Sequence, residues 1–280
     1  MSYNQNKRFY NSTILLGIIV AIALIALLYF FSWSLIVESY FENEGALGVV
    51  LVILSRIGIV SGMTIYTFHQ WFKQEEQYFS DIPFLFGMFF LFLIFGKSLD
   101  LFNNFIRFEL DENLVLLVFK ARYIISVLDL LPMIYLSMDM LLFSLSLKKK
   151  FEKLTKEKYR AKIRKQILIL ILIVEFIAGI VAPNLTLLSV LYPIIIIPSL
   201  LTIAWLFNFA WRNKRLSQVS TYILMIGFGL YLISSIIRPL IQIIVGESSL
   251  FVILAESIDL VVFTIIIIGF YKKSNYPPNQ

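Results

Sequence analysis

Ionisable side chains recur inside long apolar stretches of this sequence, where each charge must be paired or hydrated. A charge at bilayer depth costs roughly 2.5 kcal/mol or more, so it needs a partner or a function. Nine such residues fall in the half of their stretch that we assign to the outer leaflet: Arg56, Lys97, Asp100, Arg122, Asp129, Glu175, Arg238, Glu256 and Asp259. These nine form the candidate ligand-binding or ion-pair cluster.

Helical spacing predicts that several of the nine share helix faces, since residues three, four or seven positions apart lie on one side of a helix. The pairs concerned are Lys97 with Asp100, Arg122 with Asp129, and Glu256 with Asp259. The four bases and five acids of the cluster nearly balance. Two interpretations remain open: the charges are buried ion pairs that fix helix packing, or they line a water-filled cavity, open to the outside, that binds a ligand or ion.

The residue types that are missing exclude much enzyme chemistry. The sequence has no cysteine and one histidine, His69. Thiolate nucleophiles, cysteine-ligated zinc, iron–sulfur clusters, multi-histidine metal sites and most Ser-His-Asp arrangements are therefore excluded. We predict no catalytic residue set, no metal and no cofactor. Only carboxylates and lysines remain for acid–base chemistry, which disfavours an enzyme.

Composition predicts an all-α, polytopic integral membrane protein. Hydrophobic residues make up 59% of the 280 positions and the mean hydropathy is +0.85, whereas soluble domains average about 45–50% apolar residues. We treat residues 1–280 as one integral membrane domain. Eight stretches are expected to span the bilayer as helices: 13–33, 46–66, 82–102, 114–147, 166–182, 187–211, 219–245 and 250–271.

A basic segment, residues 148–165, predicts the orientation of these spans. It carries ten Lys/Arg against two Glu, and short loops of this kind remain cytoplasmic. In the resulting topology cytoplasmic segments hold eighteen Lys/Arg, outer loops hold one (Arg107) and the spans hold five. Both termini are then cytoplasmic, in what we expect to be the cell membrane.

The same asymmetry bears on partners. The net charge of +6 is explained by the cytoplasmic loops, so we predict no nucleic-acid partner. The bilayer itself is the expected partner of the spans. The 148–165 segment is expected to contact anionic lipid head groups, at about 1 kcal/mol per basic residue, or a cytoplasmic protein.

Weak similarities between the two halves suggest a parallel four-plus-four repeat. Trp71 and Trp211 each close a span at the cytoplasmic boundary, and Asp129 and Asp259 each lie about halfway along one. Matching spans run in the same direction, as a parallel repeat requires.

Two further patterns concern helix packing. Gly58-x-x-x-Gly62 predicts close packing against another helix of the same chain, with a dimer contact as the alternative. Span 114–147 exceeds the roughly 20 residues that a bilayer needs, so it must tilt, kink at Pro132 or project beyond the membrane.

The layout favours a sensor or receptor that binds a small polar or charged ligand in a polar cavity in the outer half of the membrane and signals through a separate partner. Charges concentrated on one side, with an apolar inner half, suit such a protein better than a transporter, which needs a path to both sides. A secondary transporter of a small solute or ion, and a structural membrane subunit whose charges are only ion pairs, are the alternatives.

The topology can be tested directly because the chain lacks cysteine. Single cysteines introduced at Glu42, Glu109 or Glu247 should react with a membrane-impermeant thiol reagent added outside cells. Cysteines at Lys156 or Asn213 should react only after permeabilisation, because the positive-inside rule places them in the cytoplasm. Labelling of the Lys156 variant from outside would overturn the topology.

Overall fold

The structure is a computed structural model that describes residues 3–106, 110–147, 149–214, 216, 219–246 and 248–273, with side chains from residue 15 onward. All regular secondary structure in these ranges is helical, which confirms the predicted fold class. The helices are α1 (Tyr3–Phe31), α2 (Trp33–Glu42), α3 (Ala46–Phe72), α4 (Ile82–Ile106), α5 (Glu112–Ser146), the 3-10 helix η1 (Lys149–Thr155), α6 (Glu157–Val181), α7 (Leu185–Arg212), α8 (Thr221–Val245) and α9 (Ser249–Tyr271). Arg107, Glu109, Lys148, Arg215 and Glu247, which the topology argument uses, lie outside the described residues.

Several helices are built to cross a membrane. Within the described ranges, α3, α4, α7, α8 and α9 are long and apolar enough, and α1 with α2 forms a sixth candidate span that bends by 64°. The protein is therefore a multi-pass membrane protein. Helices α5 and α6 are long but more highly charged, so the eight-span topology stays a prediction for them.

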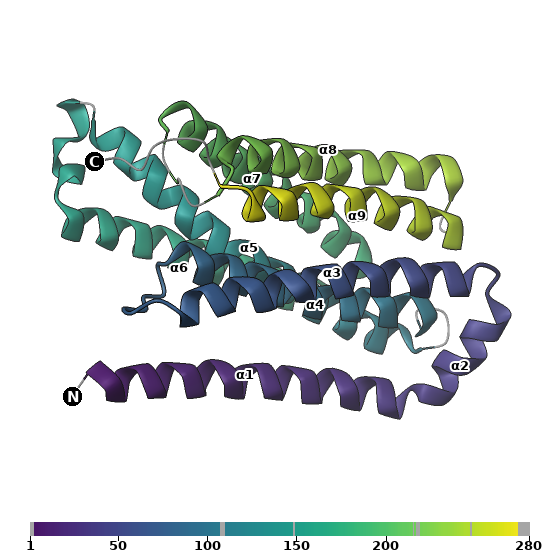
Figure 1. The fold of residues 1–280 in the computed structure, drawn as a ribbon. Coiled ribbons are helices and arrows are strands. Elements are labelled where there is room, and N and C mark those ends of the chain that lie inside the picture. The colour runs from purple at the N-terminus through teal and green to yellow at the C-terminus, as the bar shows by residue number, and fades with distance from the viewer. Residues whose placement is uncertain are drawn as a thin grey trace.

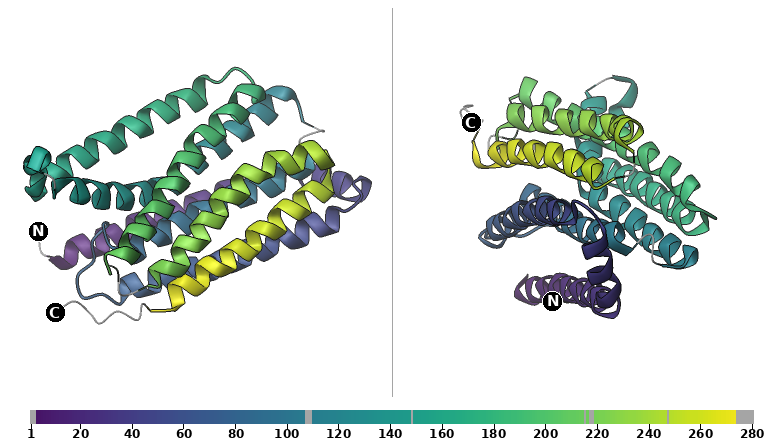
Figure 2. Two further views of the ribbon diagram at one scale, coloured as in Figure 1. Left: turned by 90° about the horizontal axis from the view of Figure 1, so that it is seen from above. Right: turned by 90° about the vertical axis from the view of Figure 1, so that its right-hand side faces the viewer.

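The helices run roughly along one direction, so that the connections between them lie at the two ends of the bundle (Figures 1 and 2). We call one the basic end: it carries the start of α1, the end of α9 and η1, with Lys149, Lys150 and Lys153 exposed. We call the other the α2 end, where α2 and the turn from α8 to α9 lie.

Residues 34–45, between the first two predicted spans, hold three glutamates and no Lys or Arg, and this composition predicts an outer loop. The structure instead has helix α2 over most of them. The apolar face of α2 packs on α4: the ring centroids of Tyr40 and Phe105 are 6.2 Å apart, and Ile36 joins the same hydrophobic cluster. Gly45 then adopts a left-handed conformation, φ +84°, and α3 begins at the next residue. The loop prediction is wrong because it weighed the three glutamates and overlooked this apolar face.

The basic segment 148–165 is also not a loop over most of its length. It contains η1 and the first turns of α6, which form a hairpin with α5 (Figure 1). Arg164 donates to Asp139 and its guanidinium lies 4.1 Å from the Tyr135 ring centroid, so α6 is fastened to α5. At 35 residues, α5 measures about 52 Å against a hydrocarbon core of about 30 Å, so it is longer than an untilted span requires.

Two hydrophobic clusters fill the bundle on either side of its middle. Toward the basic end, α4, α7, α8 and α9 contribute buried phenylalanines that pack ring on ring, with centroids 4.2 Å apart for Phe86 and Phe270 and 5.3 Å apart for Phe207 and Phe228. Toward the α2 end, a smaller cluster of α3, α4 and α5 includes Ile53, Phe102 and Phe105. The polar side chains described below lie between these clusters.

Helix packing supports the proposed repeat only in part. The order α3–α4–α5 in the first half matches α7–α8–α9 in the second, since consecutive helices pack together in both. The remaining pair differs: α1 packs on α4, whereas α6 packs mainly on α5. The repeat therefore stays a prediction.

Small residues bring helices together, but not where the Gly58 motif predicted. A Cβ added at Gly58 or Gly62 would meet nothing within 4 Å, so the predicted contact within the chain is wrong. One close approach lies between α8 and α9, where a Cβ at Gly227 would lie 2.7 Å from Ile266 and one at Gly269 would lie 2.9 Å from Leu224 Cγ.

These two kinds of glycine should respond differently to substitution. Gly269→Ala should lower the free energy of unfolding by about 1–3 kcal/mol, because the added methyl overpacks the contact with Leu224. Gly58→Ala is the matched control and should leave it unchanged or raise it by up to about 1 kcal/mol, because alanine favours a helix more than glycine does. Thermal unfolding of both variants in detergent measures the difference, and equal melting temperatures would contradict the packing.

Candidate functional site: an intramembrane charge network

Seven of the nine predicted residues form one connected set of ion pairs within the described structure. We call this set the charge network: Arg56, Lys97, Asp100, Arg122, Arg238, Glu256 and Asp259. They come from α3, α4, α5, α8 and α9, so the network ties together helices from both halves of the chain.

The centre of the network is the pair of carboxylates on α9. Arg56 Nη1 donates to Glu256 Oε2 at 2.6 Å and to Asp259 Oδ2 at 2.7 Å. Arg238 Nη2 donates to the same two carboxylates, at 3.0 Å and 2.8 Å. Ser234 donates to Asp259 as well. Two guanidinium groups thus hold one pair of acids, three positions apart on one helix face as the sequence predicted.

An arm of the network runs from this centre to α5. Lys97 Nζ lies 2.7 Å from Glu256 Oε1 and 2.8 Å from Asp100 Oδ2. Arg122 then donates two hydrogen bonds to the Asp100 carboxylate, from Nε at 2.5 Å and from Nη2 at 3.1 Å. Gly96 makes room for this guanidinium, because a Cβ there would lie 3.0 Å from Arg122 Nη1.

All seven residues lie at a similar depth, which explains how five helices can meet there. Each is six to ten residues from the end of its helix nearest the α2 end. At 1.5 Å per residue this is about 9–15 Å of helix. Charges of opposite sign at one depth on neighbouring helices can pair without bending the backbone.

The network is packed rather than open. Five of its side chains are less than a tenth exposed, Asp100 is 24% exposed and Arg238 is 33% exposed. The two hydrophobic clusters lie on either side of it along the bundle. Within the described part of the chain, Asp100 and Arg238 are therefore the members of the network most accessible to a ligand.

Two of the nine predicted residues are outside the network. Glu175 of α6 accepts from the Tyr123 hydroxyl and belongs to the contact between α5 and α6. Asp129 is 6% exposed, two turns along α5 from Arg122, and makes no ion pair or hydrogen bond within the described residues. Arg122 and Lys97 are nonetheless close enough to act on it electrostatically.

Two aromatic contacts of the network could not be predicted from the spacing of the charged residues. Phe263 lies under Arg56, 4.7 Å from the guanidinium carbon to the ring centroid, and Tyr192 lies near Arg122 at 5.6 Å. Aromatic residues are so common in this chain that spacing could not single these out. The role of Gly96 could have been predicted, because a glycine next to a lysine inside an apolar helix indicates space for another polar side chain.

The ion pairs of the network join unequal numbers of charges, although the carboxylate of Asp129, which makes none of these pairs, also acts electrostatically on Arg122 and Lys97. The network joins four cations to three carboxylates among the described residues. Arg56 Nε and Nη2 are buried with no hydrogen-bond partner. Buried donors without acceptors are unfavourable, so these two nitrogens carry a cost within the packed network.

Comparison with known proteins assigns the chain to no family, since no family model, no curated protein and no solved structure matches it. Any functional conclusion must therefore come from the geometry.

The network should dominate the stability of the bundle. Arg56→Met leaves two carboxylates of α9 without one of their buried partners and should lower the free energy of unfolding by about 3–5 kcal/mol. Glu175→Gln, outside the network, should change it by less than about 1 kcal/mol. Thermal or denaturant unfolding in detergent compares the two, and a smaller loss for Arg56→Met than for Glu175→Gln would contradict the assignment.

Proposed function

We propose that this protein is a membrane sensor in which the charge network binds a small charged ligand from the outer side and α5 transmits occupancy to the basic hairpin of α5, η1 and α6. The observation that carries the proposal is the continuity of α5. One helix holds Arg122 of the network and ends at the hairpin.

The relay has a definite first step. Arg238 is the most exposed cation of the network and shares Glu256 with Lys97. A ligand anion that binds Arg238 weakens its hold on Glu256, so Lys97 and then Asp100 can shift. Asp100 is the carboxylate that anchors Arg122. Four ion pairs therefore connect the ligand site with α5.

The output side of the relay is the hairpin at the basic end. Arg160 and Arg164 fasten α6 to Asp139 of α5, so rotation of α5 moves both helices. The exposed lysines of η1 carry this movement to a cytoplasmic protein or to anionic lipid head groups. Helix shifts of about 1–2 Å are the usual scale of such signals.

The phenylalanines toward the basic end favour a sensor over a transporter. A transported solute has to pass Phe86, Phe89, Phe207, Phe228 and Phe270, all of which are buried. No comparable barrier opposes a protein that only binds its ligand at one side.

The relay can be tested without knowing the ligand, by releasing Arg122 from its anchor. Asp100→Asn should change the distance between spin labels on cysteines placed at Lys73 and Lys153 by about 1–2 Å or more. Pulsed electron paramagnetic resonance in nanodiscs measures it. Glu38→Gln, an acid on α2 outside the network, is the control and should leave the distance unchanged. An unchanged distance in Asp100→Asn would refute the relay.

A cysteine at Ser137 separates this function from transport. Ser137 is buried on α5 in the half toward the basic end, and cysteine is close to it in size. In a sensor it stays unreactive toward an impermeant thiol reagent added on the cytoplasmic side, whereas cysteine at Asn213 reacts. Rapid reaction at Ser137 would show an inward-open state and favour the transporter.

A further inference from the structure

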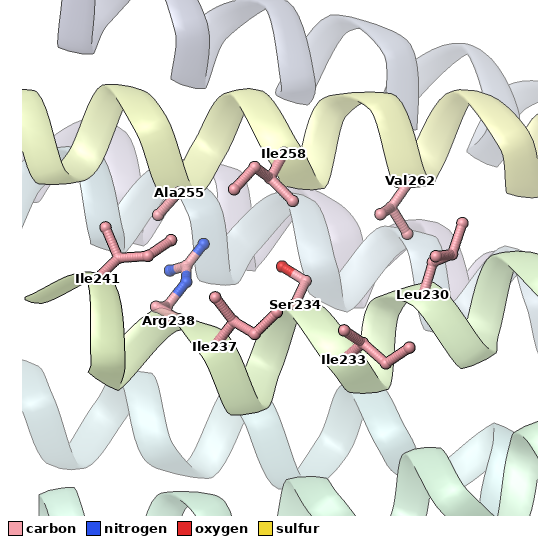
Figure 3. Close-up of a pocket in the computed structure, with 9 residues that line it drawn as sticks. All are labelled: Leu230, Ile233, Ser234, Ile237, Arg238, Ile241, Ala255, Ile258 and Val262. Carbon is pink, nitrogen blue, oxygen red and sulfur yellow. The ribbon is translucent and has the colours of Figure 1, made fainter.

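A narrow groove between α8 and α9 leads to the charge network from the membrane-facing surface. Its volume is about 110 Å³. Figure 3 shows its walls: Leu230, Ile233 and Ile237 of α8 lie opposite Ile258 of α9, and the polar side chains among those drawn are Ser234 and Arg238. Four residues that line the groove, Leu230, Ile233, Ile237 and Ile258, are at least about a third exposed, as expected of side chains that face lipid.

Arg238 gives the groove a positive charge at one point. Among the described residues, Nη2 alone carries both of its ion pairs, so the rest of the guanidinium can donate elsewhere. An apolar groove with a cation at one end is complementary to a molecule with an alkyl chain and an anionic head.

The direction of the groove matches a lipid-like molecule of the outer leaflet. Arg238 lies seven residues before the end of α8 at Val245, and Leu230 lies eight residues deeper. At 1.5 Å per residue, Arg238 is about 10 Å from the α2 end and the groove continues about 12 Å toward the middle of the bundle. A head group held by Arg238 therefore directs its chain toward the bilayer centre.

We propose that this groove binds a long-chain fatty acid, with its carboxylate on Arg238 and its chain against Ile233, Ile237 and Leu230. The inference rests on the proposed function and names the ligand of that site. A fatty acid fits better than a phospholipid for two reasons. The groove, at about 110 Å³, has room for the first part of one chain but not for two chains joined by glycerol. Arg238 lies about 10 Å of helix from the α2 end, deeper than a phosphate group at the membrane surface is expected to lie.

Binding has a direct consequence for the network. The fatty-acid carboxylate competes with Glu256 and Asp259 for Arg238. This is the first step that the relay through Lys97 and Asp100 requires. The ligand reaches the site sideways from the bilayer, so no water-filled entrance is needed.

The test uses a long-chain fatty acid with a photoactivatable diazirine in the middle of its chain, added to the full-length protein in nanodiscs. Crosslinked peptides should map to α8 and α9, and unlabelled fatty acid should suppress the labelling. Arg238→Gln should reduce labelling about tenfold, the loss expected for one charge-assisted hydrogen bond. Ile233→Phe, which fills the groove without touching an ion pair, should reduce it as well.

The matched controls are Ile243→Phe and a neutral probe. Ile243 is 80% exposed on α8 and does not line the groove, so its variant should label like the unmodified protein. The methyl ester of the probe should label weakly and independently of Arg238. The proposal would be overturned if the ester labelled the protein as strongly as the acid, or if Arg238→Gln and Ile233→Phe labelled as strongly as the unmodified protein. Stronger Arg238-dependent labelling by a diacyl phospholipid probe would also overturn it.

Spin labels on the hairpin distinguish failure of this inference from failure of the sensor. If the fatty acid labels the groove but leaves the Lys73–Lys153 distance unchanged, the binding site stands and the relay fails. If Asp100→Asn moves the hairpin but the probe does not label α8 or α9 in an Arg238-dependent way, the relay stands and the fatty-acid site is refuted.

Discussion

The structure depends on the high free energy of a charge in a low-dielectric environment. Each ionisable group of the network is unfavourable in the bundle alone and acceptable only beside its partners, so the five helices that carry them have one arrangement that satisfies all of them. Arg56, 1% exposed between Glu256 and Asp259, is the clearest case, since it fixes α3 against α9. Dispersion between apolar surfaces alone would leave many nearly equivalent packings.

Sequence alone could predict the membrane class and most of the network, because both follow from the same constraint. Charges in apolar helices are rare, their depth follows from the helix ends, and opposite charges at equal depth pair. What sequence could not supply is which face of each helix meets which neighbour. Asp129 shares a face of α5 with Arg122, yet it lies two turns further from the α2 end, beyond the depth of the other charges.

The other differences have a similar origin. Helix α2 and the basic hairpin are held by contacts with residues elsewhere in the chain, Tyr40 with Phe105 and Arg164 with Asp139. The local composition of residues 34–45 and of residues 148–165 predicted a loop, because charged and other polar residues are frequent in both segments. The exposed Gly58 and Gly62 show the converse: a spacing that permits close packing does not create it when no helix lies on that side.

The ion pair between Arg56 and Glu256 joins residues 200 positions apart in the chain, and this separation matters during synthesis. At about 5–20 residues per second, α3 leaves the ribosome roughly 10–40 s before α9 exists. Throughout that interval Arg56 has no counter-ion from α9, while its helix must already enter a membrane. Release of α3 into lipid before α9 exists therefore carries the cost of an unpaired guanidinium, about 2.5–3.5 kcal/mol, and the arrival of α9 removes this cost.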